Sequence, residues 1–209
     1  MLGVSLTQDV RPFKGNTIIF GVDYQHFGGE AWNRFVTDHS RTEIADKSEN
    51  DIAGYIMARQ GFGHVFYLNA GIRLDHHSLT GNEWIPQAGF SFMLKEYREL
   101  KATVSKDFRN PTIRELYMFP PQNPDLRPEK LVNYELSWIQ HRVRNKLTYS
   151  LTAFYINGDN MIQTQPVNGR PQNVNTGSVE NWGFEADARY QLNPLWTLSG
   201  NYSWLRMVH

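Results

Sequence analysis

The sequence predicts an all-β fold, an antiparallel up-and-down β-barrel wall that crosses a membrane. Three observations support it: apolar and polar residues alternate along most of the chain, the alternating segments are long, and short connections alternate with long ones. Most alternating segments have about ten residues, and a tilted transmembrane strand needs roughly 9–11. Strands of ordinary globular proteins average about 5–6 residues.

The alternation is clearest from Leu147 to Tyr155, where apolar residues occupy every second position and Thr or Ser lies between them. A period of two with β-favouring residue types is typical of a β-strand. The same pattern recurs in Ile18–Gln25, His64–Asp75, Val132–Trp138, Asn181–Tyr190 and Trp196–Trp204. These segments form the backbone of the predicted sheet.

Other segments fit this pattern less well. Residues 86–94 and 99–107 alternate less cleanly, and residues 51–59 fit poorly because Tyr55 and Met57 share a row with charged residues. Only Thr112–Tyr117 is expected to be helical, because prolines confine it on both sides. In all, we expect about ten strands.

Connections of two lengths separate the strands. The short ones are expected near Arg11–Gly15, Gln60–Gly63, Lys95–Arg98, Arg142–Asn145 and Gln191–Pro194. The longer ones are expected near Gly28–Lys47, Phe108–Pro128 and Gly158–Ser178, with a modest one near Ser78–Trp84. In an up-and-down barrel this order places all short turns at one rim and all long loops at the other, as in outer-membrane barrels with short periplasmic turns and long extracellular loops.

Composition excludes several functions. The chain has 21 basic and 21 acidic residues and no cysteine. Balanced charge argues against nucleic-acid binding, which usually needs a basic surface. Without cysteine there is no disulfide scaffold, thiol nucleophile or Cys-based zinc site. The sequence shows no phosphate loop, serine-nucleophile elbow or zinc motif, so we expect no cofactor and no metal.

Alternation alone does not separate a membrane barrel from a soluble all-β binding module, whose apolar row would face a core. Three features favour the membrane. The strands are long and numerous, the loops are asymmetric, and the apolar rows are rich in Tyr, Trp, Phe and Ala. Trp196 and Trp204 bracket one strand, as aromatic belts at membrane interfaces do.

The segment from residue 108 to residue 135 contains four spaced motifs: F-R-x-P, E-L-Y, N-P-x-L and P-E-x-x-x-x-Y-E. Their residues are Phe108, Arg109, Pro111, Glu115, Leu116, Tyr117, Asn123, Pro124, Leu126, Pro128, Glu129, Tyr134 and Glu135. In this order the motifs resemble the loop-and-strand signature of TonB-dependent outer-membrane receptors. We expect a structural role for them, since prolines stiffen a long loop and its charged groups could anchor it to the barrel wall.

The resemblance implies an active transporter in the outer membrane of a Gram-negative bacterium and no enzyme activity. In this family a plug domain fills the barrel and TonB pulls on the plug. Barrels that hold a plug have about 22 strands. We therefore expect residues 1–209 to be a partial barrel that lacks the plug and the closing strands, contacts outer-membrane lipid, and meets TonB only through the missing plug.

The resemblance also limits the substrate. An iron-siderophore or a cobalamin-like ligand is expected. Haem receptors of the family carry a histidine between the F-R-x-P and N-P-x-L motifs, and this chain has none there. Five aromatic residues expected in loops are candidate ligand contacts: Trp32, Phe35, Trp84, Tyr117 and Phe119. The alternative is that they only pack the loops.

A second alternative is a complete ten-stranded outer-membrane barrel enzyme with carboxylates and histidines at its upper rim. The residues that could serve it are Asp38, His39, Asp75 and His76. No spacing requires that chemistry. Six charged residues are expected to face the lumen and to pair with one another or with a plug: Arg73, Asp75, Glu135, Glu185, Asp187 and Arg189.

Overall fold

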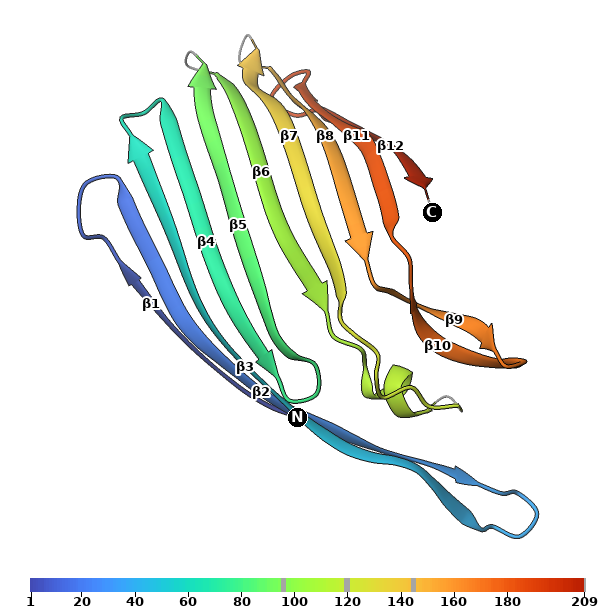
Figure 1. Cartoon of the computed structure of the whole chain (residues 1–209). Coiled ribbons are helices and arrows are strands. Elements are labelled where there is room, and N and C mark those ends of the chain that lie inside the picture. Colours follow the sequence, from blue (N-terminus) through green and yellow to red (C-terminus); the bar gives the residue numbers. More distant parts are fainter. Residues whose placement is uncertain (95–96, 119–120, 144–145, 209) are drawn as a thin grey trace.

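The computed structural model of the chain describes residues 1–94, 97–118, 121–143 and 146–208. It contains one curved sheet of ten strands in the order β1-β2-β3-β4-β5-β6-β7-β8-β11-β12, and a separate two-stranded sheet of β9 and β10 (Figure 1). The strands are β1 (Leu2–Val10), β2 (Asn16–Arg34), β3 (Arg41–Phe62), β4 (Phe66–His77), β5 (Gly81–Leu94), β6 (Arg98–Arg109), β7 (Glu129–Val143), β8 (Leu147–Asp159), β9 (Met161–Val167), β10 (Arg170–Thr176), β11 (Val179–Gln191) and β12 (Thr197–Val208).

Every neighbouring pair in the large sheet is antiparallel, and the chain runs up and down through it. This confirms the predicted fold class. The predicted helical segment is a single π-helical turn, η1 (Arg114–Met118), between β6 and β7. Within the described ranges, no helix has the length and apolar character needed to cross a membrane.

The outer face of the sheet is apolar over its whole width. Leu136 of β7 lies between Ala102 of β6 and Ala153 of β8, and Ala153 lies opposite Phe184 of β11. Leu136 and Phe184 remain 51% and 44% exposed. Such a continuous exposed apolar surface is unstable in water and suits contact with lipid.

The inner face is polar. Ser137 of β7 and Thr152 of β8, each one position from the apolar row, share a hydrogen bond of 2.9 Å. Arg73 donates to Asp23 and Asp75, which confirms the expected pairing for this residue. The other expected lumen-facing residues, Glu135, Glu185, Asp187 and Arg189, lie on the same face by register.

The poor alternation of residues 51–59 has a structural reason. Tyr55 and Met57 lie on the inner face, in one row with Asp51 and Arg59. The Tyr55 hydroxyl shares a 2.7 Å hydrogen bond with Thr7 of β1, and the guanidinium of Arg73 lies 5.8 Å from the Tyr55 ring. A large aromatic side chain is accepted on the polar wall because its hydroxyl has a partner there.

The connections differ in length from the prediction. Short turns lie at one end of the sheet, as expected, and the longer connections lie at the other, the long-loop end (Figure 1). The prediction of a loop over Gly28–Lys47 is wrong, because β2 and β3 continue as a paired ribbon to Arg34 and Arg41. Within the expected loop Gly158–Ser178, β9 and β10 form a hairpin. The loop expected from Ser78 to Trp84 is shorter, because β5 begins at Gly81.

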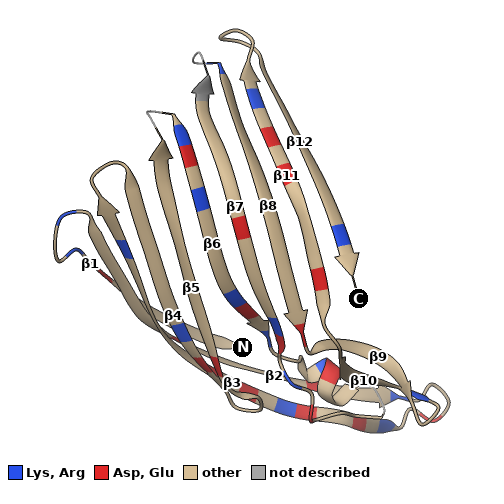
Figure 2. Cartoon of the chain, turned by 45° about the horizontal axis from the view of Figure 1, so that its top comes forward, with Lys and Arg blue, Asp and Glu red and all other residues tan. Residues whose placement is uncertain are grey.

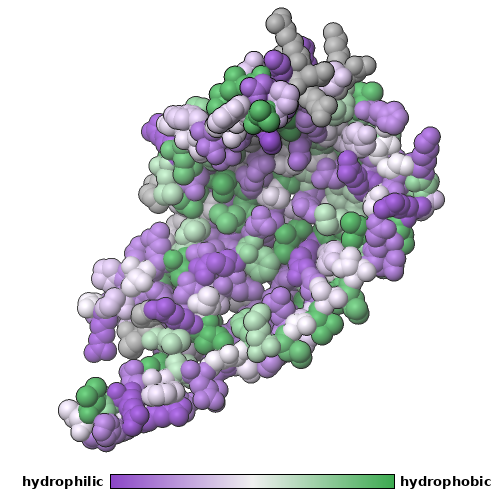
Figure 3. Space-filling view, turned by 180° about the vertical axis from the view of Figure 1, so that it is seen from behind, coloured by the Kyte–Doolittle hydropathy of each residue, from purple (hydrophilic) through white to green (hydrophobic). Residues whose placement is uncertain are grey.

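The ribbon, residues 27–34 of β2 and 41–50 of β3, extends past the ends of β1 and β4 (Figure 1). It forms because pairing at its base continues outward, with one irregularity between Ala31 and Trp32. Its surface is largely hydrophilic (Figure 3), and charged residues gather at this end of the molecule (Figure 2). Because polar residues lie on both faces of the ribbon, its sequence lacks the alternation of a strand and predicts a loop.

Candidate functional site at the long-loop end

Three segments meet at the long-loop end. They are the ribbon, the connection that contains η1 (residues 110–128, hereafter the η1 loop) and the β9–β10 hairpin. The side-chain amide of Gln122 donates to the Ile44 carbonyl over 3.3 Å, and the Lys47 ammonium lies 5.3 Å from the centre of the Tyr117 ring. Leu116 and Ala45 are both buried. The η1 loop therefore rests on the inner face of the ribbon.

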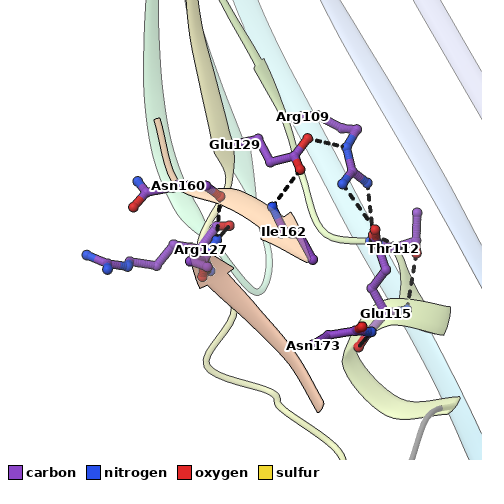
Figure 4. Close-up of polar contacts among 9 residues, drawn as sticks. Arg109, Thr112, Glu115, Arg127, Glu129, Asn160, Ile162 and Asn173 are labelled. Carbon is purple, nitrogen blue, oxygen red and sulfur yellow. Dashed lines mark hydrogen bonds and ion pairs between the residues drawn. The ribbon is translucent and has the colours of Figure 1, made fainter. Parts of the chain in front are cut away.

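Arg109, the last residue of β6, holds the η1 loop to the barrel wall (Figure 4). Its two terminal nitrogens donate to the Glu115 carboxylate over 2.8 and 3.0 Å, and its Nε donates to Glu129 over 2.7 Å. The second oxygen of Glu129 accepts the Ile162 N–H over 2.8 Å. One guanidinium thus joins η1, β7 and, through Glu129, β9.

The start of η1 is a capping box. The backbone N–H and the hydroxyl of Thr112 both donate to Glu115 over 2.8 and 2.9 Å, and the Glu115 N–H donates to the Thr112 hydroxyl over 3.2 Å. This reciprocal arrangement satisfies the free donors at a helix start. The buried ring of Pro111 lies just before it and fixes the backbone there. The sequence therefore places Glu115 where Arg109 can reach it.

The carboxylates of this network are stabilised as anions. Burial opposes ionisation of Glu115 and Glu129, but hydrogen bonds from Arg109 and from backbone N–H groups outweigh it and lower the pKa of both. The same two carboxylates raise the pKa of Arg109. All three groups lie beyond the roughly 9–11 residues of each strand that cross a membrane.

Asparagine side chains bind the η1 loop to the β9–β10 hairpin. Asn123 donates to the Asn173 carbonyl over 2.8 Å, and Asn173 donates to the Glu115 carbonyl over 3.0 Å. Asn175 accepts the Arg127 N–H over 2.8 Å and donates to the Arg127 and Asn160 carbonyls. These bonds satisfy loop backbone groups that a strand ladder would otherwise satisfy, so the loop and the hairpin form one packed unit.

The remaining motif residues lie in or next to this unit. Leu116 and Leu126 are buried, and Pro124 lies beside Asn123 in the η1 loop. Phe108 lies in β6, while Tyr134 and Glu135 lie in β7. Tyr134 faces Tyr155 across the β7–β8 pair, with ring centres 6.1 Å apart.

The candidate ligand contacts are not brought together. Trp32 lies on the ribbon with the Arg41 guanidinium 4.7 Å from its ring centre, and Phe35 lies at the ribbon tip, half exposed. Tyr117 lies in η1. The prediction that Trp84 lies in a loop is wrong. Trp84 is a strand residue of β5 and lies opposite Leu74 on the apolar outer face. Phe119 lies outside the described residues.

The residues of the enzyme alternative are also apart. Asp75 is on the inner face and bonded to Arg73, whereas His76 bonds to Asn82 over 2.6 Å on the other face. Asp38 and His39 lie at the ribbon tip, where Asp38 accepts hydrogen bonds from Ser40. Among the described residues, no three His, Cys, Asp or Glu side chains gather to hold a metal ion.

Sequence analysis missed two features at this end. Glu49 of β3 and His77 of β4 form a buried pair, with 3.2 Å between Oε2 and Nε2. Glu83 of β5 lies between two lysines, 3.1 Å from Lys106 and 2.5 Å from Lys130. No local sequence motif predicts these contacts, because they depend on how strands of different length pair.

The inner wall is hollowed below the loops. A groove of about 540 Å³ runs across β2, β3, β4, β5 and β6. Its lining combines the apolar side chains of Ile19, Met57 and Ile85 with the charged groups of Asp23 and Arg73. A surface of this kind can hold a protein segment with both apolar and charged side chains.

Comparison with known proteins identifies the class. The family model described as TonB dependent receptor-like, beta-barrel, matches residues 3–208, and the chain belongs to this family. Its wall therefore lies in the outer membrane of a Gram-negative bacterium, with the long-loop end extracellular. This confirms the resemblance, fold class and location expected from the sequence.

Individual relatives are similar over most of the chain. An iron-regulated outer membrane virulence protein of Vibrio cholerae is 31% identical over 88% of this chain. The vitamin B12 transporter BtuB of Vibrio vulnificus is 25% identical over 84%. The crystal structure of the siderophore receptor PirA from Pseudomonas aeruginosa shares the fold, with a TM-score of 0.81 at 20% identity, and the match covers 98% of this chain and 39% of that one. The chain spans 28% of the length of both curated relatives.

Proposed function

We propose that this chain forms part of the wall and extracellular loops of a receptor that takes up a scarce nutrient across the outer membrane. The Arg109 network carries the proposal. It fixes a loop unit above a polar lumen, and a binding surface at the mouth of a barrel needs such a fixed scaffold. The names of the relatives, an iron-regulated protein and a vitamin B12 transporter, agree with it.

The proposed substrate is an iron-siderophore or a cobalamin-like compound. Trp32, Phe35 and Tyr117 all lie on the ribbon or the η1 loop, at the mouth. Exposed aromatic rings beside cationic groups suit large, flat or anionic ligands. Haem is less favoured, because the segment between Arg109 and Leu126 contains no histidine. We keep these three aromatic residues as proposed contacts and drop Trp84, which faces outward.

The barrel is proposed to be completed by further strands and filled by a plug. β1 pairs only with β2, and β12 pairs only with β11, so the described sheet has two edges. The bilayer core cannot satisfy unpaired backbone groups at an edge. Additional strands, on this or another polypeptide, would close the sheet. A plug seated on the inner groove would provide the contact with TonB.

Transport is proposed in place of catalysis or soluble binding. The apolar outer face crosses ten strands and needs lipid, which argues against a soluble module. The residues that an enzyme would need at the rim point to different faces or lie at the ribbon tip. Two of the relatives named above are a vitamin B12 transporter and a siderophore receptor.

Uptake measurements test the proposal. The gene that encodes this chain is deleted from its host, and uptake of radioactive iron-siderophores and of cobalamin is compared with the parent strain. We expect loss of one class of uptake, which returns with the intact gene and does not return when Arg109→Ala is present. Unchanged uptake of every siderophore and of cobalamin in the deletion strain would contradict the proposal.

A further inference from the structure

The junction between the ribbon and the sheet contains a buried acid–histidine pair. The side chains of Glu49 and His77 are each 1% exposed. β4 pairs with β3 only as far as His77, opposite Asp51, and beyond this point the ribbon leaves the sheet. The Phe27 ring lies opposite Glu49 in β2, 6.1 Å from the His77 ring. The pair therefore occupies the base of the ribbon.

The hydrogen-bond partners define where the protons lie. His77 Nδ1 accepts the Leu79 N–H over 3.4 Å, and a neutral ring in this arrangement carries its hydrogen on Nε2, toward Glu49. Although the two groups are 3.2 Å apart, neither oxygen of Glu49 has a well-directed hydrogen bond. With an ionised Glu49 the pair thus holds a buried negative charge that is poorly compensated, and such a charge is costly.

Neighbouring charged groups do not neutralise this buried negative charge. Asp51 and Asp75 lie on the same face, and each has one buried oxygen without a hydrogen bond. Arg73 is engaged with Asp75 and Asp23. The Lys47 ammonium of the ribbon lies over the Tyr117 ring of the η1 loop. His76 is hydrogen-bonded to Asn82 on the opposite face of the sheet. The side chains of Arg73 and Lys47, the two cations named here, thus have other partners.

The direction of the proton equilibrium follows from burial. Burial raises the pKa of Glu49, and the neighbouring His77 opposes this only in part. Burial, helped by Asp75, raises the pKa of Asp51 to about 6. A carboxyl group whose pKa is raised in the packed state stabilises that state at low pH, and the stabilisation is lost as pH rises through the raised value. β3 has 22 residues and ends at Phe62 at the short-turn end, and roughly 9–11 residues of a strand cross a membrane, so both groups lie beyond that part.

We propose that the Glu49–His77 pair, with Asp51, is a proton-operated clasp that holds the ribbon against the sheet in mildly acidic surroundings and loosens it at neutral and higher pH. Uptake of one proton makes the pair neutral as a unit. Loss of that proton leaves buried negative charge, which is relieved when the ribbon base opens and water enters. The extracellular loops then differ in order with the pH of the medium.

Hydrogen exchange tests the clasp in the intact receptor that carries this chain, embedded in lipid nanodiscs. Protection of the backbone amides of Ser48–Asn50 is measured from pH 5 to pH 8, after correction for the intrinsic exchange rate. We expect protection to fall about tenfold over this range, because one unit of pKa shift corresponds to about a tenfold change in the equilibrium.

Two variants separate the clasp from a general effect of pH. The double variant Glu49→Gln/Asp51→Asn removes both carboxyl groups that bind the proton and should keep the ribbon protected at every pH. The matched control Glu30→Gln, on the same ribbon but paired with exposed Arg41, should keep the wild-type profile. Exchange in β7 and β8 reports that the barrel wall is folded. A flat wild-type profile, a pH dependence in Glu49→Gln/Asp51→Asn as large as in the wild type, or loss of ribbon protection at all pH values in that variant would each overturn the proposal. None of these outcomes bears on nutrient uptake, which is tested separately.

Discussion

At the scale of single residues, Arg109 serves the loops in a way that lysine could not. Its planar guanidinium donates in two directions at once, to Glu115 in η1 and to Glu129 in β7. A lysine ammonium is a point charge on a flexible stem and does not reproduce this fork. The sequence motif therefore encodes a joint between a loop and a strand.

Replacing Arg109 with alanine should release the η1 loop. The change leaves two carboxylates near one another without their cation. Hydrogen bonds to charged groups contribute about 1.5–3 kcal/mol each, but Arg109 is 43% exposed, so solvent screening reduces the loss to about 1–2 kcal/mol. Limited proteolysis of folded receptor in detergent should then cut between residues 112 and 128 several times faster than in the wild type.

Arg127→Ala is the matched control, since its side chain is exposed in the same loop. Arg109→Lys should behave like Arg109→Ala in most respects, because the fork is lost. Equal proteolysis of wild type and Arg109→Ala would show that the network does not hold the loop.

Acid should release the same loop. Burial would raise the pKa of Glu115 and of Glu129, but hydrogen bonds from Arg109 outweigh it and hold both pKa values below the ordinary value of a glutamate. A depressed pKa gives stability that is present above the unfolded value and is lost as pH falls through the folded value. Loop protection measured by hydrogen exchange should thus persist to about pH 4.5 and fall below it. In Glu115→Gln the fall should be smaller; an identical fall would assign the effect to other groups.

At the scale of elements, the β5–β6 pair has an open seam near the long-loop end. Their backbone pairing ends at Gln87 opposite Ser105, although β4–β5 and β6–β7 pairing continues further. The next β5 residue toward the long-loop end is Pro86, which has no N–H to donate. Glu83 bridges the gap through Lys106 and Lys130, and the Thr80 hydroxyl donates to Asn110. Side-chain contacts therefore join β5 to β6 where backbone hydrogen bonds between them are missing.

Glu83→Gln should loosen this seam. The amide keeps the size of the carboxylate but removes the charge that two lysines share. We expect a loss of about 1–3 kcal/mol and faster amide exchange in residues 106–109, while exchange in β7–β8 below the seam is unchanged. Glu180→Gln, at the end of β11, serves as the control. Unchanged exchange at residues 106–109 would mean that the ion pairs do not close the seam.

The elements differ in how well the sequence predicts them. β8 and β12 are predicted because one face meets lipid and the other the lumen, and this enforces alternation. The ribbon is not predicted, because residues 27–34 are mostly exposed to water and neither face meets lipid; strand pairing and the η1 loop hold it. The sequence predicts Trp84 at the end of a modest connection near Ser78–Trp84, yet β5 begins at Gly81.

At the scale of the whole molecule, the sheet separates two environments. Aromatic and aliphatic side chains cover the outer face, while charged residues lie mostly toward the long-loop end (Figure 2). The motif residues from Arg109 to Glu129 could be predicted as a loop anchor, because their spacing is local. The Glu49–His77 pair could not, since it requires the register between β3 and β4 and the burial of both side chains at the base of the ribbon.

Site-directed labelling of β7 tests most directly whether the apolar row faces lipid. The chain has no cysteine, so single cysteines at positions 134, 135, 136 and 137 can carry a fluorophore in the intact receptor, reconstituted in bilayers. Quenching by a lipid-bound group and by a water-soluble agent is then compared, with Val36→Cys at the exposed ribbon tip as the aqueous reference. We predict that labels at Tyr134 and Leu136 are quenched from the lipid and those at Glu135 and Ser137 from water. Aqueous quenching at all four positions, or the opposite alternation, would contradict the membrane-spanning wall.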